Sequence, residues 1–460
     1  MSRVSTQNAA LVAGPILALL AAYLMHGAGF SADAAATAAV TVLCVVWWVF
    51  EPVPIPATSL LPLALLPLLG VLTPRDVAGA YGHSLILLLL GGFMLSTALE
   101  RNGAHRRIAL TMVRAFGGNS GRRLVFGFMA ASAGLSMWIS NTATTLMLLP
   151  VALAVLERSD DPDLAKPLLL GIAFAASVGG IGTPIGTPPN VIFMGVYEAQ
   201  VGERVTFATW MSWAVPIVLV FVPAIGIYLT RHLGNHPAPA MPHPGAWRPA
   251  EVRVLSVFAL TALFWVTRLE PFGGWSGALG VDNSDDYMVA FLAVVALFLI
   301  PDGRGERLLD WETAARIPWG MLILFGAGIT IAEAFTQSGL SGSIGAALSN
   351  LAVLPVFLIM LGICLVVTFL TETTSNTATT TLLMPILAAA ALGAGMDPKL
   401  LMVPAAMSAS CAFMLPVATA PNVIVYSTNR FTIEQMAKEG VALNFIGALI
   451  VASGCYLLIG

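Results

Sequence analysis

The segment Ser140-Asn141-Thr142-Ala143-Thr144-Thr145 occurs a second time in this chain, as Ser375-Asn376-Thr377-Ala378-Thr379-Thr380. Each copy is a short run of hydroxyl and amide side chains inside apolar sequence. Each is followed by a proline at the same distance, Pro150 and Pro385. The copies lie 235 residues apart in a chain of 460 residues. The duplication predicts a binding site to which both halves of the chain contribute.

The composition is that of a polytopic membrane protein. Hydrophobic residues make up 58% of the chain and charged residues only 10%, whereas soluble domains carry about 25% charged residues. A membrane-spanning helix needs about 20 apolar residues. We therefore expect an all-α protein with about eleven transmembrane helices plus two re-entrant hairpins. No basic or acidic tail suggests a nucleic-acid partner, and the four cysteines are scattered singly, so neither a metal cluster nor a cofactor is expected.

The apolar pattern locates the spans and the hairpins. The first four spans are expected at 9–27, 34–50, 57–72 and 84–100. A basic amphipathic segment, 101–118, should lie along the membrane surface. Residues 124–156 are too many for one span and too few for two with a turn. This length predicts a re-entrant hairpin with the first motif at its tip, and 353–392 predicts a second hairpin around the second motif.

Each hairpin is followed by an interrupted span. The span 167–197 contains four glycines and three prolines between Gly179 and Asn190, and 400–428 contains Leu415-Pro416-Val417-Ala418-Thr419-Ala420-Pro421-Asn422. Prolines remove backbone donors, so neither segment can be one continuous helix. The order span, surface helix, hairpin and broken span thus occurs twice, and Gly91 and Gly326 share the offset of the two motifs. This is an internal repeat.

The distribution of basic residues predicts the orientation. With the N-terminus in the cytoplasm, 17 of the 21 lysines and arginines face the cytoplasm, and the other four are Arg75, Arg204, Arg268 and Lys399. Five passages separate the hairpins, so the first should enter from the cytoplasm and the second from outside. The sequence therefore predicts an inverted-topology repeat in the plasma (inner) membrane, with the C-terminus outside.

Two interpretations of the motifs compete. Serine and threonine often serve as small packing residues between membrane helices. Alternatively, hairpin tips and broken helices leave free backbone groups, so that helix N-termini suit carboxylates and unwound carbonyls suit Na⁺. The six-residue recurrence, with a Gly/Pro break after each copy, favours a substrate site flanked by two ion sites.

The run Ser410-Cys411-Ala412-Phe413-Met414-Leu415-Pro416-Val417-Ala418-Thr419-Ala420-Pro421-Asn422-Val423-Ile424-Val425, together with both motifs, closely resembles the divalent anion:sodium symporter family. The resemblance covers essentially the whole chain. It implies a homodimer in which a transport part moves like an elevator against a scaffold part. The scaffold would comprise 1–123 and 231–352, and the transport part 124–230 and 353–460.

The resemblance also implies site residues. The first Na⁺ site would use Ser136, Ser140, Asn141 and Gly186, and the second Thr371, Thr374, Asn376 and Ala418. Substrate carboxylates would meet Asn141, Thr142, Thr187, Pro188, Asn376, Thr377 and Thr419. Ala420 stands where the first half has Pro188, which departs from the pattern of some members. Glu372, beside the second motif, could tune the second Na⁺ site, carry a proton, or fix the hairpin tip by hydrogen bonds.

The leading functional hypothesis is Na⁺-coupled uptake of a C4-dicarboxylate such as succinate, malate or fumarate. Citrate or sulfate as substrate, proton coupling and dicarboxylate exchange are the alternatives within transporters. An ion channel is the alternative from another class. An enzyme is not expected, because no nucleophile–base pair is visible in the sequence.

Overall fold

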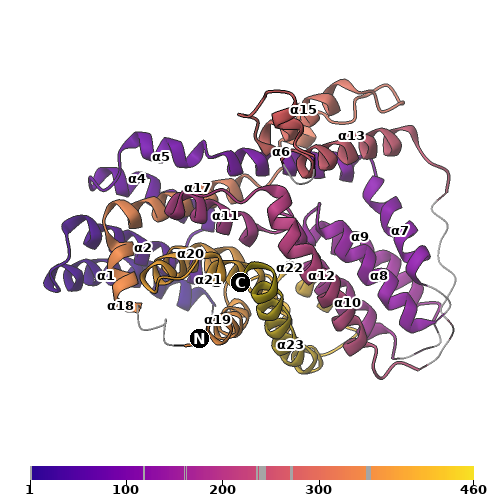
Figure 1. Ribbon diagram of the computed structural model, residues 1–460. Coiled ribbons are helices and arrows are strands. Elements are labelled where there is room, and N and C mark those ends of the chain that lie inside the picture. Colours follow the sequence, from indigo (N-terminus) through magenta and orange to yellow (C-terminus); the bar gives the residue numbers. More distant parts are fainter. Residues whose placement is uncertain are drawn as a thin grey trace.

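The computed structural model describes residues 3–117, 120–159, 161, 163–234, 237, 245–269, 273–348 and 354–460. These residues fold into α-helices joined by turns and short 3₁₀ segments (Figure 1). The helices of the first half are α1 (Arg3–Gly27), α2 (Ala32–Phe50), α3 (Ile55–Thr58), α4 (Leu61–Leu68), α5 (Pro74–Tyr81), α6 (Ser84–Arg101), α7 (Ala104–Gly117), α8 (Gly121–Ser136), α9 (Asn141–Leu156), α10 (Ala165–Gly179), η1 (Gly180–Gly182), α11 (Pro188–Val201) and α12 (Phe207–Leu229).

The last eight described elements of the second half follow the same order as the last eight of the first half. Its helices are α13 (Pro249–Val266), α14 (Trp275–Ala278), α15 (Asp286–Leu299), α16 (Trp311–Ala314), α17 (Trp319–Gln337), α18 (Leu340–Leu348), α19 (Val356–Thr371), α20 (Asn376–Gly393), α21 (Lys399–Ser408), η3 (Pro416–Ala418), α22 (Ala420–Tyr426) and α23 (Ile433–Ile459). The expected division after residue 230 coincides with the end of α12. The one after 123 falls in the first turn of α8, and the one after 352 lies outside the described residues.

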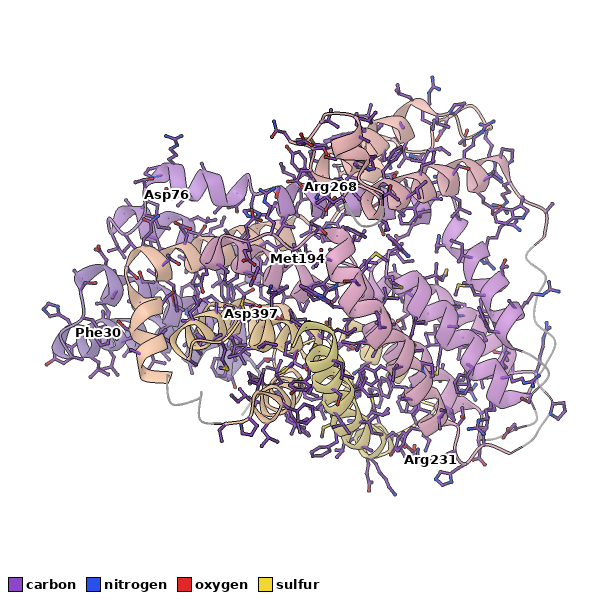
Figure 2. The ribbon with its side chains drawn as sticks, viewed as in Figure 1. Phe30, Asp76, Met194, Arg231, Arg268 and Asp397 are labelled. Atoms are coloured by element: carbon purple, nitrogen blue, oxygen red, sulfur yellow. The ribbon has the colours of Figure 1, made fainter. Side chains whose placement is uncertain are left out.

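The helical fold of a membrane protein is confirmed. Within the described ranges, nine helices are long and apolar enough to cross a membrane. Figure 2 shows the charged Asp76 and Arg231 near the edge of the molecule, while the buried Met194 lies inside. The number of eleven spans stays a prediction, because several apolar helices, such as the 14-residue α15, are shorter than a hydrocarbon core.

The segment expected to form one span, 57–72, is an apolar helical region with an interruption, and its crossing of the membrane stays a prediction. The chain forms two short helices there, α3 and α4, with the interruption at Ser59 and Leu60. Pro62 has no N–H to donate to the carbonyl of Thr58, so a continuous helix would lose that bond. The sequence pattern of apolar residues could not distinguish this arrangement from a single helix.

Both motifs start at the turn between two paired helices and continue into the beginning of the second helix. α8 and α9 have 16 residues each and are joined by a turn that ends at Ser140. α19 has 16 residues and α20 has 18, with a turn that ends at Ser375. At 1.5 Å per residue, a 16-residue helix is about 24 Å long, less than a hydrocarbon core of about 30 Å. These lengths suit hairpins that enter and leave on one side, although re-entry itself stays a prediction.

The predicted helix interruptions are confirmed. α10 ends at Gly179, and after one 3₁₀ turn and a second turn at 184–186 the chain enters α11 at Pro188. In the second half α21 ends at Ser408 and α22 begins at Ala420. Each break therefore leaves a stretch of backbone without helical hydrogen bonds in the interior of the protein.

The basic segment after α6 forms α7 as expected, but not all its charges are solvated. Arg106 and Arg114 are exposed, whereas Arg107 is buried. Its Nε donates to Glu251 Oε2 on α13 over 2.6 Å, and the guanidinium stacks over the ring of Trp247. This buried ion pair attaches α7 to the start of the second half.

α10 lies at the centre of the helix packing. Every residue from Pro167 to Gly179 is buried, and the helix packs against α8, α9, α12 and α22. Gly179 allows the closest approach, since a Cβ at this position would overlap the backbone of Ala133 on α8. Small residues at such crossings are typical of membrane helices, whose association depends on close packing.

Replacing Gly179 by alanine is expected to destabilise the protein by about 1–3 kcal/mol, the usual cost of overpacking. The measurement is the apparent melting temperature of the purified protein in detergent. Gly362→Ala is the matched control, because nothing lies within 4 Å of the Cβ it would add. Equal melting temperatures for the two variants would contradict the close approach of α8 and α10.

Candidate functional site

The first motif is held at the N-terminus of α9 by hydrogen bonds within its own hairpin. Ser140 caps the helix, since its Oγ accepts a bond from the amide of Ala143 over 3.1 Å. Asn141 Oδ1 accepts a hydrogen bond from Ser136 Oγ in the last turn of α8. Thr145 Oγ1 donates to the carbonyl of Asn141 over 2.8 Å. Asn141 is therefore fixed on both its backbone and its side chain.

The second motif repeats this arrangement at the start of α20. Ser375 Oγ accepts from the amide of Ala378 over 3.5 Å. Thr371 Oγ1 donates to Asn376 Oδ1 over 2.5 Å, and Thr380 Oγ1 donates to the carbonyl of Asn376 over 2.7 Å. In both hairpins the hydroxyl that holds the asparagine comes from five residues earlier. The two copies of the motif thus make equivalent hydrogen bonds in the two hairpins.

The asparagines of the broken helices support the unwound backbone. Asn190 Nδ2 donates to the carbonyls of Gly180 and Thr183 over 3.0 and 2.7 Å. Asn422 Nδ2 donates to the carbonyls of Ala412 and Leu415, both over 3.0 Å. Each asparagine bonds the carbonyls ten and seven residues before it. This role was missed from the sequence, where the recurring Pro-Asn-Val-Ile was the available signal.

Glycines allow the first hairpin tip, the turn before α9, to pack closely against the first break, the interruption between α10 and α11. A Cβ on Gly180 would lie 2.7 Å from Asn141 Oδ1 and 3.1 Å from the carbonyl oxygen of Gly186. Any side chain here would therefore displace Asn141. Three of the residues expected at the first Na⁺ site, Ser136, Asn141 and Gly186, are neighbours in the structure.

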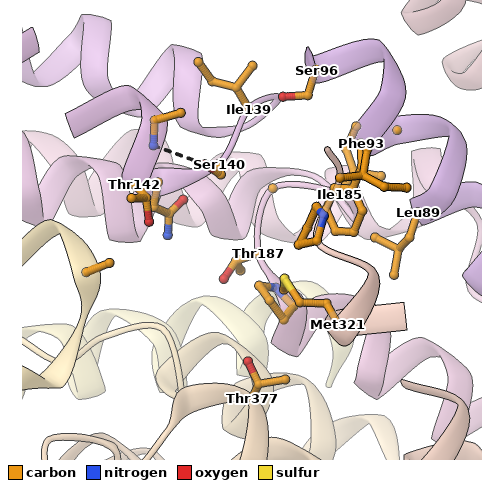
Figure 3. A pocket seen from close by; sticks show the side chains of 18 of the residues that line it. Leu89, Phe93, Ser96, Ile139, Ser140, Thr142, Ile185, Thr187, Met321 and Thr377 are labelled. Atoms are coloured by element: carbon orange, nitrogen blue, oxygen red, sulfur yellow. Dashed lines mark hydrogen bonds between the residues drawn. The ribbon is translucent and has the colours of Figure 1, made fainter. Parts of the chain in front are cut away.

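The tips and breaks of both halves surround one cavity of about 630 Å³. Figure 3 shows Thr142, Thr187 and Thr377 around it, with Leu89, Phe93 and Met321 on another side. All seven residues expected to contact substrate line this cavity, namely Asn141, Thr142, Thr187, Pro188, Asn376, Thr377 and Thr419. Five of the eight expected Na⁺ ligands line it as well: the two asparagines and also Ser140, Gly186 and Ala418.

The other expected Na⁺ ligands lie behind this surface. Ser136 and Thr371 are fully buried and bond the two asparagines. Thr374 Oγ1 is bonded to the carbonyl of Leu370 over 2.9 Å and to Thr379 Oγ1 over 2.6 Å. In this conformation the Thr374 hydroxyl is thus occupied within its own hairpin.

The cavity is the meeting point of helix N-termini. α9, α11, α20 and α22 all begin at residues that line it, respectively Asn141, Pro188, Asn376 and Ala420. Each N-terminus is the positive end of a helix dipole, equivalent to about half an elementary charge for a long helix. The first turns of α9 and α20 also present backbone amides, whereas α11 begins with Pro188 and Pro189, which have no N–H to offer. α22 has only seven residues, so its contribution is smaller. Such an arrangement suits a carboxylate.

The two breaks also touch each other at this cavity. Thr187, the residue before α11, makes no capping bond to its own helix. Its Oγ1 lies 3.4 Å from Ser410 Oγ in the second break. The two broken helices are therefore in direct side-chain contact beside the cavity.

Glu372 fixes the second tip by hydrogen bonds. Its carboxylate is buried, and Oε1 accepts from the amides of Phe413 and Met414 over 2.7 and 2.8 Å. Oε1 also accepts from Asn444 Nδ2 over 2.8 Å, and Oε2 accepts from the amide of Leu415 over 3.0 Å. Of the roles open from the sequence, these contacts match the structural one, since the carboxylate ties the hairpin to the second break.

The structure also places residues at the cavity that the sequence patterns did not indicate. Arg316 and Glu100 line it, and so does an apolar wall formed by Leu89, Phe93 and Met321. Arg316 belongs to the linker between α16 and α17, which contains neither motif. No sequence signal related this linker to the motifs, because their contact depends on the tertiary fold.

Comparison with known proteins places the chain among transporters. A family model described as citrate transporter matches residues 45–402. Two curated proteins named sodium-dependent dicarboxylate transporter SdcS are each 38% identical to this chain. The protein from Staphylococcus saprophyticus aligns over 98% of this chain and 91% of its own length, and the protein from Staphylococcus aureus over 96% and 89%.

Two solved structures share the fold. The YdaH transporter of Alcanivorax borkumensis has a TM-score of 0.57 at 15% identity, covering 83% of this chain and 86% of its own. The efflux pump MtrF of Neisseria gonorrhoeae has a TM-score of 0.59 at 16% identity, covering 85% and 84%. At these identities the likeness concerns the fold alone.

Replacing Glu372 by glutamine is expected to destabilise the protein by about 2–3 kcal/mol, because an amide nitrogen would face backbone donors that now bond a carboxylate. Thermal unfolding of the purified protein without ligands measures the loss. Glu333→Gln is the control, since that carboxylate bonds the neighbouring Gln337 on the same helix. Unchanged stability of the Glu372 variant would show that these bonds do not support the tip.

Proposed function

The chain belongs to the divalent anion:sodium symporter family, and from this we propose that it imports C4-dicarboxylates such as succinate, malate or fumarate together with Na⁺. The observation that carries the proposal is the cavity lined by both tips and both breaks. The names of the relatives support Na⁺ coupling and a dicarboxylate. The cavity residues support a small dianion held by amides and hydroxyls.

The charge of the substrate must be balanced without cations from the motifs, because neither motif contains lysine or arginine. We assign this role to bound Na⁺ and to the helix N-termini at the cavity. The first Na⁺ would be held by Ser136, Ser140, Asn141 and the carbonyl of Gly186. The second would be held by Thr371, Thr374, Asn376 and the carbonyl of Ala418. Na⁺ would bind first and order both tips for the substrate.

The second Na⁺ site requires a rearrangement. Thr374 now bonds Thr379, so its hydroxyl oxygen must turn to serve as a ligand. Thr371 already contacts Asn376 and needs no such change. We infer that Na⁺ binding at the second tip exchanges an internal hydrogen bond for an ion contact. This exchange would couple ion binding to the shape of the tip.

Transport would follow an elevator mechanism between the two proposed parts. The moving part would be 124–230 with 353–460, and the scaffold 1–123 with 231–352. The cavity mouth includes Arg316 and Glu100, which are cytoplasmic in the orientation derived from the basic residues. The conformation would accordingly be the inward-facing one. A homodimer in the plasma membrane, with its N-terminus in the cytoplasm, completes the proposal.

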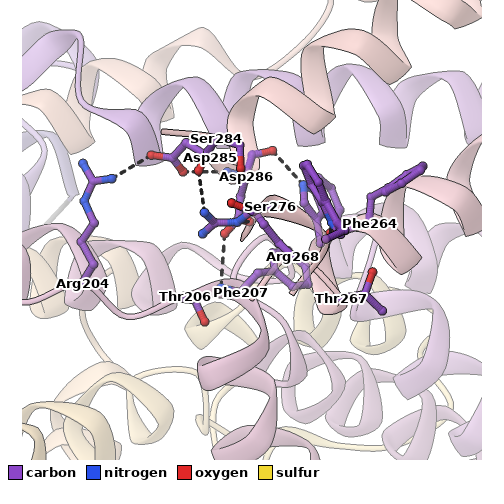
Figure 4. A network of polar contacts seen from close by, with 12 residues as sticks. Arg204, Thr206, Phe207, Phe264, Thr267, Arg268, Ser276, Ser284, Asp285 and Asp286 are labelled. Carbon is purple, nitrogen blue, oxygen red and sulfur yellow. Dashed lines mark hydrogen bonds and ion pairs between the residues drawn. The ribbon is translucent and has the colours of Figure 1, made fainter. Parts of the chain in front are cut away.

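On the opposite side, polar contacts join the two proposed parts (Figure 4). Arg204 Nη1, between α11 and α12, lies 2.9 Å from Asp285 Oδ2. The amide of Phe207 donates to Asp286 Oδ2 over 3.3 Å. Glu198 Oε2 lies 3.4 Å from His83 Nε2. We call these three contacts the outer latch, and they would have to break in the outward-facing state.

The rival functions differ in what they require. Citrate and sulfate are also anions that the amides and hydroxyls of the cavity could bind, and the matching family model is described as citrate transporter. The names of the 38% identical relatives favour a dicarboxylate. Proton coupling and exchange would not need Na⁺ flow. An ion channel would pass Na⁺ without substrate.

In proteoliposomes, an inward Na⁺ gradient is expected to drive uptake of radiolabelled succinate, and replacing Na⁺ by choline at constant pH should abolish it. Competition by unlabelled citrate and sulfate reports the substrate preference. Uptake that persists in choline and follows a pH gradient would instead indicate proton coupling. Sodium flux independent of succinate would indicate a channel.

Asn141→Ala and Asn376→Ala are each expected to lower this uptake at least tenfold, because each removes an amide that would contact both ion and substrate. Asn283→Ala, in an exposed loop, is the control and should transport normally. Circular dichroism and gel filtration establish that the variants are folded. Undiminished uptake by both asparagine variants would contradict the site.

Breaking the outer latch with Asp285→Asn is expected to shift the protein towards the outward-facing state. Leu146→Cys, exposed at the cavity, provides the label site, and the four native cysteines are buried. Labelling by an impermeant thiol reagent added from the cytoplasmic side should slow when Asp285→Asn is introduced. Glu434→Gln, an exposed change elsewhere, should leave the labelling rate unchanged, and an equal rate in both backgrounds would contradict the latch.

A further inference from the structure

Among the described residues, two charged side chains line the cavity, Arg316 and Glu100. Glu100 is the penultimate residue of α6, and its carbonyl accepts from the amides that follow the helix, whereas its side chain makes no hydrogen bond or ion pair with the described residues. Arg316 lies in the segment between α16 and α17. The remaining lining is neutral. A dianion that enters the cavity is therefore repelled by the carboxylate of Glu100 and attracted by the guanidinium of Arg316.

Arg316 is only weakly engaged. Its Nη2 donates to Glu312 Oε1 over 2.6 Å, and the two side chains are 69% and 82% exposed. Pairs of this kind, four residues apart and exposed, contribute about 0.3–0.5 kcal/mol. The guanidinium can thus exchange Glu312 for another carboxylate at little cost.

The chemistry of Arg316 suits a substrate carboxylate. A guanidinium presents paired donors that match the two oxygens of a carboxylate, and it is always charged. Its position in the same cavity as both hairpin tips places it on the path of a dicarboxylate. The unpaired Glu100 opposes anion passage, so a cation at this mouth has a clear electrostatic role.

We propose that Arg316 is a second carboxylate-binding residue, which holds the substrate at the cavity mouth by exchanging its bond with Glu312. This inference rests on the proposed function. Arg316 belongs to the proposed scaffold part, so it does not travel with the tips. It acts in the open conformation seen here and on one side of the membrane only, the cytoplasmic side in the proposed orientation.

The test compares Arg316→Gln, Arg316→Lys and Glu312→Gln in right-side-out and inside-out membrane vesicles from cells that express the full chain. The measured quantity is the KM for succinate on each side. Arg316→Gln should raise the cytoplasmic KM about fivefold, which corresponds to one modest hydrogen bond. The external KM should stay within a factor of about two, the spread expected of a residue that is not engaged.

The matched variants separate binding from structure. Glu312→Gln also breaks the ion pair but leaves Arg316 free, so it should lower the cytoplasmic KM or leave it unchanged. Arg316→Lys keeps the charge and should give an intermediate value. Raising the ionic strength with choline chloride should reduce the difference between Arg316→Gln and the unmodified protein, because salt screens charges beyond about 8–10 Å.

Several results would overturn the inference. Equal effects of Arg316→Gln and Glu312→Gln would mean that the ion pair is structural only. An equal change on both sides, or none on either, would remove the side-specific role. If the unmodified protein shows no Na⁺-dependent succinate transport in these vesicles, the proposed function fails and this inference fails with it. If the unmodified protein transports succinate and the variants have the same KM values as it does, the proposed function stands and only the role of Arg316 is contradicted.

Discussion

Backbone polar groups inside a membrane protein must find partners, because no bulk water is available to them. A binding site made from broken helices therefore has to satisfy most of the freed groups while leaving a few for the ligand. Here Asn190 and Asn422 take up unwound carbonyls, and Glu372 takes up three unwound amides. The unpaired amides that remain belong to helix N-termini at the cavity. The chemistry of the site follows from this division.

The two halves use different side chains to connect the hairpin turn to the broken helix. Met137 and Glu372 both stand four residues before the motif asparagine. In the first half, the hydroxyl of Thr183 in the broken helix donates to the carbonyl of Met137 in the hairpin turn, so a neutral side chain connects the two. In the second half, the Glu372 carboxylate accepts from the backbone of the break. The second tip thereby holds a buried negative charge that the first lacks. The halves are accordingly equivalent in shape but not in electrostatics, which favours unequal affinities for two cations.

The repeat made much of this architecture predictable. A motif at membrane depth with a proline break after it has few structural solutions, so the hairpins and interruptions could be inferred before the fold was known. The residues that meet at the cavity were predictable for the same reason, since Asn141 and Asn376 are marked by the motif itself. The interruption within the third expected span, 57–72, was not predicted, because hydropathy does not register the hydrogen bond that Pro62 removes. Arg316 was beyond prediction, because nothing local relates an exposed linker to a site formed by other helices.

The location of charge around the cavity constrains how a transporter of this design can work. In the proposed division, the part that moves presents neutral oxygens and amides to the cavity, whereas Glu100 and Arg316 belong to the part that stays. If the moving part contributes only neutral groups, a charged ligand can cross the membrane only when bound counter-ions of opposite charge move together with it. Under the proposed function, Na⁺ would then be required for movement as well as for binding, since the tips alone would carry an uncompensated dianion through a medium of low dielectric constant. Coupling would thus arise from the energetics of the moving part, and the fixed charges would influence only how substrate enters and leaves.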